Sequence, residues 1–438
     1  MRQREIFAFW LPLFASWLLM TAEGPTVSTV INRLPDEVVM LAAQGIVVGL
    51  SVTIESPIIT LLATSTAVGR DRPSFELLRR FTIHWMILLT VVTAAVAFTP
   101  LFDLVVGRLL AVPGEVAVWV RPGLRIMTLW SAAIAWRRFL QGIMIRFNHT
   151  RKVAWGTAVR LAASAGTVIG LALLTDWPGV AVGATALMAG VIAEAAYATI
   201  AIRPILARLP AAASRQPWSY RRLFWFHLPL AGTSLLTLLA QPLVAYTLAR
   251  LAFPTRSLAA WPVIFQFLLI VRAAGFALPE AVIALSDGMH TFRPLRRFTF
   301  LLALVSTLLM ATIVMTPLRD VYIFVIQDMA PEVGQLAADG LALFLPLPAL
   351  TLLIAWLRGL LIHQETTRAI NAGMGVNLVV TALLLGLGLS QGWPGIRTAA
   401  IAFNLAALVE FFFLWWRAAA ALDFPFTLFE RPGRAWSA

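Results

Sequence analysis

The sequence predicts an all-α integral membrane protein with about twelve transmembrane helices, arranged as two parallel six-helix halves. Three observations support this fold class: a very apolar composition, a series of long apolar runs, and an internal repeat. Hydrophobic residues make up 60% of the 438-residue chain, charged residues make up 13%, and the mean hydropathy is +0.84. A soluble domain of this length needs far more polar surface than that, so we expect the lipid bilayer to be its solvent.

The apolar runs predict helices rather than strands, because they are rich in Leu, Ala and Ile and show no two-residue alternation. A bilayer core about 30 Å thick takes about 20 residues per helical crossing. Inside it, only helices or closed barrels satisfy the backbone. Six spans are expected in each half, at residues 6–32, 37–67, 81–102, 117–145, 152–175 and 179–203, then 221–249, 258–286, 297–318, 335–361, 367–390 and 395–418.

Basic and acidic residues alternate between the loops that join these spans. One set of loops is rich in arginine, with Arg70, Arg72, Arg79, Arg80, Arg146, Arg151, Arg208, Arg215, Arg293, Arg296 and Arg297. The opposite loops hold acids, among them Asp36, Asp103, Asp176, Asp320 and Asp328. The positive-inside rule places the arginine-rich loops and both termini in the cytoplasm, with the chain in the inner membrane. Because the basic residues lie in short loops rather than on one soluble face, the net charge of +13 does not indicate nucleic-acid binding.

An internal repeat relates the two halves. Arg79-Arg80-Phe81-Thr82 recurs as Arg296-Arg297-Phe298-Thr299, 217 positions later (296 − 79 = 217). The same offset relates further pairs: Phe9 and Phe226, Pro25 and Pro242, Arg33 and Arg250, Thr99 and Thr316. Each half has an even number of spans, so both insert with the same orientation as two lobes, residues 1–210 and 211–438. By analogy at the level of the fold, such transporters bind substrate between their halves and alternate access.

Short motifs are spread over most of the chain: Phe9-Trp10-Leu11-Pro12-Leu13, Glu23, Met40-Leu41-Ala42, Gly45, Leu50, Arg70-Asp71-Arg72, Phe224-Trp225, Gln241-Pro242, Arg250, Phe344-Leu345-Pro346-Leu347-Pro348 and Leu357-Arg358-Gly359. With these motifs and its two six-helix repeats, the chain resembles the progressive ankylosis (ANK) protein family within the MATE-like (MOP) superfamily of exporters and flippases. The resemblance implies a MATE-like fold and an exporter whose substrates are small organic or phosphate-type anions.

Charged residues within the spans are the candidate functional residues, since each costs roughly 2.5–3.5 kcal/mol at the bilayer centre. Glu23 lies two residues before Pro25, where it is either a proton or cation site or a cap on backbone donors freed by a kink. Glu55 and Arg272 occupy equivalent positions, and we expect them to face each other across the pseudo-twofold axis. They either line a cavity between the halves or form a buried ion pair. Arg272 is the leading candidate to hold an anion, because guanidinium offers a planar fork of donors.

Other polar positions also recur in both halves. Arg160 is equivalent to Asn377, and both are candidates to bind substrate. The alternative for Arg160 is that its long side chain extends to the membrane–water interface. Glu194 and Glu410 are equivalent to each other and have either a coupling or gating role, as for Glu23 and Glu55, or a structural one. Three arginines at expected cytoplasmic ends of spans are interpreted as headgroup anchors or as a funnel for anions: Arg137, Arg138 and Arg358.

Several activities have no support in the sequence. The single lysine, Lys152, follows Arg151 rather than a glycine-rich loop, so there is no Walker A motif. The five histidines form no His-Glu-x-x-His pair, and the absence of cysteine excludes thiol catalysis, thiolate metal sites and disulfides. We therefore expect neither an enzyme nor a bound cofactor or metal.

The leading hypothesis is a secondary transporter that exports a small organic or phosphate-type anion, as a monomer and with H⁺ or Na⁺ as a possible coupling ion. Two alternatives from the same superfamily stay open: a flippase for lipid-linked oligosaccharides and an extruder of organic cations or drugs. A scaffolding protein is the alternative outside transport, and it predicts that Glu55 and Arg272 close into a dry ion pair with no cavity around them.

Overall fold

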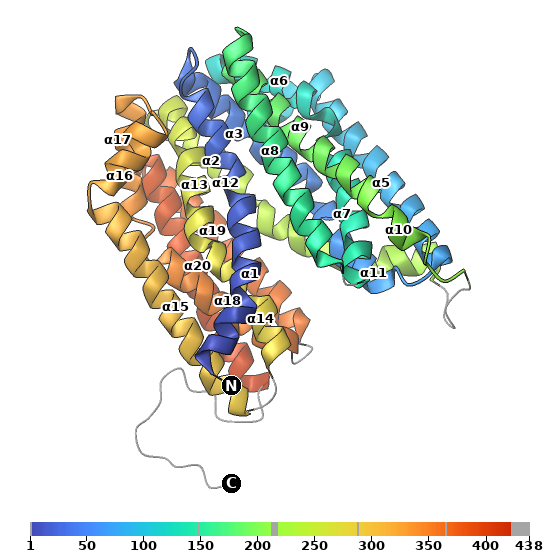
Figure 1. The fold of residues 1–438 in the computed structure, drawn as a ribbon. Helices are drawn as coiled ribbons and strands as arrows, with labels where there is room; N and C mark the ends of the chain where they lie inside the picture. Colours follow the sequence, from blue (N-terminus) through green and yellow to red (C-terminus); the bar gives the residue numbers. More distant parts are fainter. Residues whose placement is uncertain (1, 148, 212–217, 287–288, 364–365, 422–438) are drawn as a thin grey trace, which may run out of the picture.

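The computed structural model describes residues 2–147, 149–211, 218–286, 289–363 and 366–421, and every regular element within these ranges is a helix (Figure 1). The all-α prediction is therefore confirmed. The first half contains α1 (Gln3–Thr21), α2 (Glu23–Ile31), α3 (Glu37–Ile59), α4 (Leu61–Val68), α5 (Arg72–Phe98), the π-helix η1 (Asp103–Leu109), α6 (Gly114–Ile126), the 3-10 helix η2 (Met127–Leu129), α7 (Trp130–Arg146), α8 (Thr150–Leu174), α9 (Gly179–Ala201) and α10 (Arg203–Leu206). The second half contains α11 (Tyr220–Leu238), α12 (Ala240–Leu248), α13 (Pro254–Phe276), α14 (Leu278–Leu285), α15 (Met289–Met315), α16 (Leu318–Asp320), the π-helix η3 (Val321–Ile326), α17 (Pro331–Ala342), α18 (Leu347–His363), α19 (Thr367–Ser390) and α20 (Gly395–Ala421).

Ten helical segments of the described chain are long and apolar enough to cross a membrane, and the pair α17–α18, bent by 51°, makes an eleventh. The expected span at 117–145 does not pass as one apolar helix. It is divided into α6 and α7 by the 3-10 turn η2, and it carries Arg121, Arg125, Arg137 and Arg138. The chain is a multi-pass membrane protein whose fourth expected span is a broken, arginine-bearing helix pair.

The outer surface of the bundle is apolar, as a lipid-facing surface requires. Leu173 and Leu174 are 79% and 84% exposed, and Leu383 is 67% exposed. The largest fully buried side chains include Phe81 and Phe139 in the first half, with a matching aromatic core in the second. An apolar exterior of this extent is not sustainable in water, but it matches the hydrocarbon of a bilayer.

The backbone shows the repeat directly. The described non-glycine residues with positive φ form two pairs at the 217-residue offset: Asp36 (56°) with Phe253 (55°), and Ala111 (51°) with Asp328 (52°). The π-helices η1 and η3 also begin at matching places. Left-handed backbone at a non-glycine residue is unusual, so its recurrence at equivalent positions indicates that the halves share one local geometry.

Prolines divide the first span of each half at the same point. Pro25 has no N–H to bond the carbonyl four residues earlier, and α1 ends at Thr21 before α2 begins at Glu23. Pro242 acts in the same way between α11 and α12, which end and begin at Leu238 and Ala240.

The first helix of each half crosses to the other half. Figure 1 shows α1 beside α14 and α15 near the N-terminus, while α11 lies beside elements of the first half. Trp10 Nε1 donates to the Ala274 carbonyl (3.1 Å), and at the equivalent place a ring nitrogen of His227 bonds the Pro57 carbonyl (3.0 Å). Toward this end the two halves diverge, whereas they meet at the end where α2 and α6 lie (Figure 1). At the divergent end, each half therefore packs against the first helix of the other half.

Candidate functional site

Each half contains a buried glutamate that receives hydrogen bonds from equivalent positions. In the first half, Gln141 Nε2 donates to Glu194 Oε1 (2.9 Å). In the second half, Arg358 Nε donates to Glu410 Oε1 (3.1 Å), and Arg358 lies 217 residues after Gln141 (358 − 141 = 217). Glu194 and Glu410 thus occupy the same structural place, as the sequence predicted from their recurrence.

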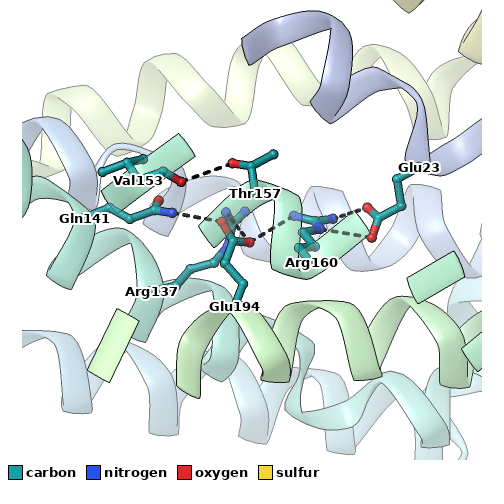
Figure 2. Close-up of polar contacts among 7 residues, drawn as sticks. All are labelled: Glu23, Arg137, Gln141, Val153, Thr157, Arg160 and Glu194. Atoms are coloured by element: carbon teal, nitrogen blue, oxygen red, sulfur yellow. Dashed lines mark hydrogen bonds and ion pairs between the residues drawn. The ribbon is translucent and has the colours of Figure 1, made fainter. Parts of the chain in front are cut away.

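The first-half charge cluster is built around Arg160 of α8, which lies between two carboxylates (Figure 2). Its guanidinium makes a bidentate contact to Glu23, with Nη2–Oε2 at 2.5 Å and Nε–Oε1 at 3.0 Å. On its other side, Nη1 is 3.8 Å from Glu194 Oε2, which is also 2.8 Å from Arg137 Nη1. The Glu194 side chain is fully buried and that of Arg137 is 5% exposed. A paired, hydrogen-bonded network is the arrangement in which charges are tolerated at this depth.

Two expectations from the sequence are corrected here. The Glu23 carboxylate binds Arg160, and no backbone N–H of the described residues donates to it. Arg137 is a buried partner of Glu194 and not a headgroup anchor, because α7 directs it into the first half. Likewise, Arg358 reaches inward to Glu410.

Glu55 of α3 belongs to the same first-half cluster but forms no ion pair with a described residue, and the indole of Trp130 is close enough to act on it as a donor. Its side chain is buried, and its Oε2 accepts no hydrogen bond from the described residues. The charges of Arg137, Arg160 and Arg138 act on it. A buried carboxylate oxygen without a well-formed hydrogen bond is costly, and binding a proton there would reduce that cost.

The second half contains a cavity of about 220 Å³ that brings together several of the residues singled out in the sequence. It is lined by Trp17, Arg272, Gly275, Phe276, Pro279, Thr351, Ile354, Ala355, Arg358, Asn377, Ala407 and Glu410. Arg272 Nε donates to Thr351 Oγ1 (2.7 Å), and its guanidinium carbon lies 5.4 Å from the Phe276 ring centroid. Asn377 Nδ2 donates to Glu410 Oε2 (2.9 Å). Arg272, Asn377 and Glu410 therefore share one cavity.

Substitutions between the repeats explain why this space is open. The positions of Asn377 and Ile354 are held in the first half by Arg160 and Arg137, whose guanidinium groups reach Glu194. Shorter side chains at the same places in the second half leave room beside Glu410. The cavity therefore lies within the second half and includes Trp17 from the exchanged helix α1.

Glu55 and Arg272 do not pair, contrary to one expectation from the repeat. Arg272 experiences the charges of Arg358 and Glu410, while Glu55 experiences those of the first-half arginines. The two side chains occupy equivalent places in separate halves, so each is next to the charges of its own half. The dry ion pair expected for a scaffolding protein is also not formed, and Arg272 borders a cavity.

Two arginines close the end of the molecule where the halves meet, and the sequence reasoning did not identify this role. Arg250 donates across to the carbonyls of Arg108 (3.2 Å), Leu109 (2.9 Å) and Leu110 (2.9 Å) at the end of η1. Arg33, its repeat equivalent, donates across to the carbonyls of Val325 (3.4 Å) and Ile326 (3.3 Å) at the end of η3. Carbonyls at a helix C-terminus lack intrahelical donors and carry partial negative charge, so a cation caps them well. The recurrence of Arg33 as Arg250 was the available signal.

Comparison with solved structures shows the same fold over nearly the whole chain. The lipid II flippase MurJ, in an inward closed conformation, matches with a TM-score of 0.69 and 11% identity, covering 93% of this chain and 87% of that one. An outward-facing multidrug-resistance MATE family transporter of the MOP superfamily matches with 0.67 and 14%, covering 96% and 97%. A MOP superfamily transporter from Pyrococcus furiosus, described as having a binding pocket of reverse polarity, matches with 0.66 and 11%, covering 96% of each.

The chain therefore has the fold of the MATE-like (MOP) transporters, which confirms the predicted fold class. The sequence matches no protein-family model, and no curated protein gives a match. The finer resemblance to the ANK family has no support in these comparisons.

Proposed function

We propose that this protein is a secondary transporter that moves a small anionic compound across the membrane by alternating access. The observation that carries the proposal is Arg272, whose guanidinium borders the second-half cavity and has no carboxylate within ion-pair distance in the described chain. Glu410 is already engaged by Arg358 and Asn377. A guanidinium without a carboxylate partner, beside a cavity with mainly apolar lining, favours a bound anion.

The fold supplies the means of alternation. MATE and MurJ structures with this fold are described in inward- and outward-facing or closed conformations. In this chain the halves contact each other through Arg33 and Arg250 at one end and diverge at the other (Figure 1). With the arginine-rich loops in the cytoplasm, the closed end is extracellular and the divergent end faces inward. Export then requires the two arginine caps to break.

Coupling to an ion is assigned to the first-half charge cluster, with Glu55 as the main candidate beside Glu23 and Glu194. Its Oε2 is buried without a well-formed hydrogen bond, so protonation lowers the cost of burying that carboxylate. Glu55→Gln is expected to abolish the dependence of transport on a pH gradient in proteoliposomes while Arg272-dependent ligand binding persists. Transport by Glu55→Gln that still follows the pH gradient would exclude this assignment.

The first experiment is a thermal-shift screen of the protein purified in a neutral detergent. It compares citrate and pyrophosphate with cationic dyes, in wild type, Arg272→Ala and Arg397→Ala. Arg397 is an exposed arginine of α20 outside the cavity, and it serves as the matched control. Stabilisation by anions that is lost only in Arg272→Ala supports the proposal. Stabilisation by cations alone contradicts it and favours an extruder of organic cations.

A flippase for lipid-linked sugars is the second candidate, supported by the likeness to the lipid II flippase MurJ. A pyrophosphate linker is also an anion, so Arg272 fits it as well. Transfer of a fluorescent lipid-linked pyrophosphate between leaflets of proteoliposomes tests this candidate. Transfer that depends on Arg272, together with no response to soluble anions, would favour the flippase over the exporter of small anions.

A further inference from the structure

The second-half cavity has a net charge of one positive unit. Of its three charged side chains, Arg358 and Glu410 form an ion pair, and both Glu410 oxygens are engaged, because Asn377 donates to the second. Arg272 uses its Nε for Thr351, and no described residue accepts a hydrogen bond from its two terminal nitrogens. Four N–H donors on these two nitrogens are thus available, and two of them form one planar edge that suits the two oxygens of a single carboxylate or a similar group.

The wall next to this guanidinium is aromatic. The Phe276 ring centroid lies 5.4 Å from the guanidinium carbon and 5.3 Å from the Trp17 ring, with the two rings tilted by 47°. The rest of the lining is mainly apolar, with Gly275, Pro279, Ile354, Ala355 and Ala407. An anion bound by Arg272 therefore has apolar and aromatic surface beside it.

The size of the cavity limits the ligand. Its volume of about 220 Å³ is below the range of about 300–1,000 Å³ that holds drug-sized ligands. Its single uncompensated charge also limits the number of negative charges, because a second anionic charge would be buried without a partner. Both limits point away from nucleotides and pyrophosphates.

On the proposed function of Arg272 as the anion site, we infer that the ligand of the second-half cavity is a small monoanion with an apolar or aromatic body, such as an aromatic monocarboxylate. Arg272 holds the carboxylate, and the Trp17–Phe276 wall contacts the body. The aromatic wall includes Trp17 of α1, the helix that continues into Glu23 of the first-half cluster.

Isothermal titration calorimetry on the full chain in neutral detergent tests this inference. The probes are benzoate, acetate, pyrophosphate and benzylammonium. Benzoate is expected to bind at least about tenfold more tightly than acetate, because the ring adds apolar burial, and more tightly than pyrophosphate. Arg272→Gln is expected to weaken benzoate at least about tenfold, through loss of a charge-assisted contact. Phe276→Leu is expected to weaken benzoate while leaving acetate unchanged, and Arg397→Gln is expected to change neither.

The outcomes separate this inference from the proposed function. Pyrophosphate bound more tightly than benzoate, in an Arg272-dependent way, overturns the monoanion but leaves anion transport standing. Binding of benzylammonium alone, or no Arg272-dependent binding of any anion, overturns both. Misfolding of Arg272→Gln is checked in two ways. Its size-exclusion profile should be like that of wild type, and Arg272→Lys, which retains the charge, should keep partial benzoate binding.

Discussion

The arginine caps that join the halves should control which end of the molecule is open. Arg250 donates to three carbonyls of the opposite half, two of them at 2.9 Å, whereas Arg33 donates to two at 3.3 and 3.4 Å and lies 3.5 Å from the exposed carboxylate of Asp328. Both arginines are partly exposed, so each contact is worth less than a buried charge-assisted bond. We expect Arg250→Gln to destabilise the closed end by about 1–2 kcal/mol and Arg33→Gln by less than about 1 kcal/mol. The first value corresponds to a population shift of roughly tenfold.

Double electron–electron resonance between pairs of spin labels measures this shift directly. The chain has no cysteine, so introduced cysteines are the only labelling sites. Asp176→Cys with Gln391→Cys places one label on an exposed loop of each half at the closed end. Arg151→Cys with Arg368→Cys places one label at an exposed position in the first turn of α8 and one in the first turn of α19, at the divergent end. In Arg250→Gln, the distance between the two labels at the closed end should shift to longer values. The distance between the two labels at the divergent end should shift to shorter values.

A control at the same end separates gating from a general loss of charge. Arg256 pairs with Glu332 within the second half, so Arg256→Gln removes an arginine without breaking a contact between halves. Its distance distributions should match those of wild type. If Arg250→Gln leaves both distributions unchanged, or if Arg33→Gln has the larger effect, the reasoning from the geometry of the caps is refuted.

Two stability predictions follow from the packing within the halves. Glu194→Gln breaks an ion pair that is almost fully buried and should lower the free energy of unfolding by about 3–5 kcal/mol, whereas Glu410→Gln should cost less because its arginine partner is 27% exposed. Equal losses of thermal stability in detergent would contradict this ranking. Gly45→Ala places a Cβ 2.5 Å from the Pro262 ring across the interface and should cost about 1–3 kcal/mol, whereas Gly49→Ala meets no atom within 4 Å. A thermal melt of Gly45→Ala that equals that of Gly49→Ala would show that the halves can adjust freely at this contact.

The sequence alone was enough to predict the all-α membrane fold class and the internal repeat. Hydropathy reports how each segment partitions into lipid, and ten of the twelve expected spans are long apolar helices in the described chain, with the bent pair α17–α18 as an eleventh. The offset of 217 residues also indicated which positions are equivalent, and the structure bears this out for Glu194 with Glu410 and for Arg33 with Arg250. The fourth span was harder to describe, because its arginines are satisfied inside the protein and hydropathy does not report that.

Only the tertiary structure decided which charges meet. The repeat offset predicts that Glu55 and Arg272 are equivalent, but the distance between equivalent residues depends on where the pseudo-twofold axis lies. The structure places each within its own half, and it exchanges α1 and α11 between the halves. Arg160 pairs with Glu23 because α2 and α8, far apart in sequence, pack side by side. Ion pairs and cavities arise from contacts between distant segments, whereas lipid partitioning is a property of each segment on its own.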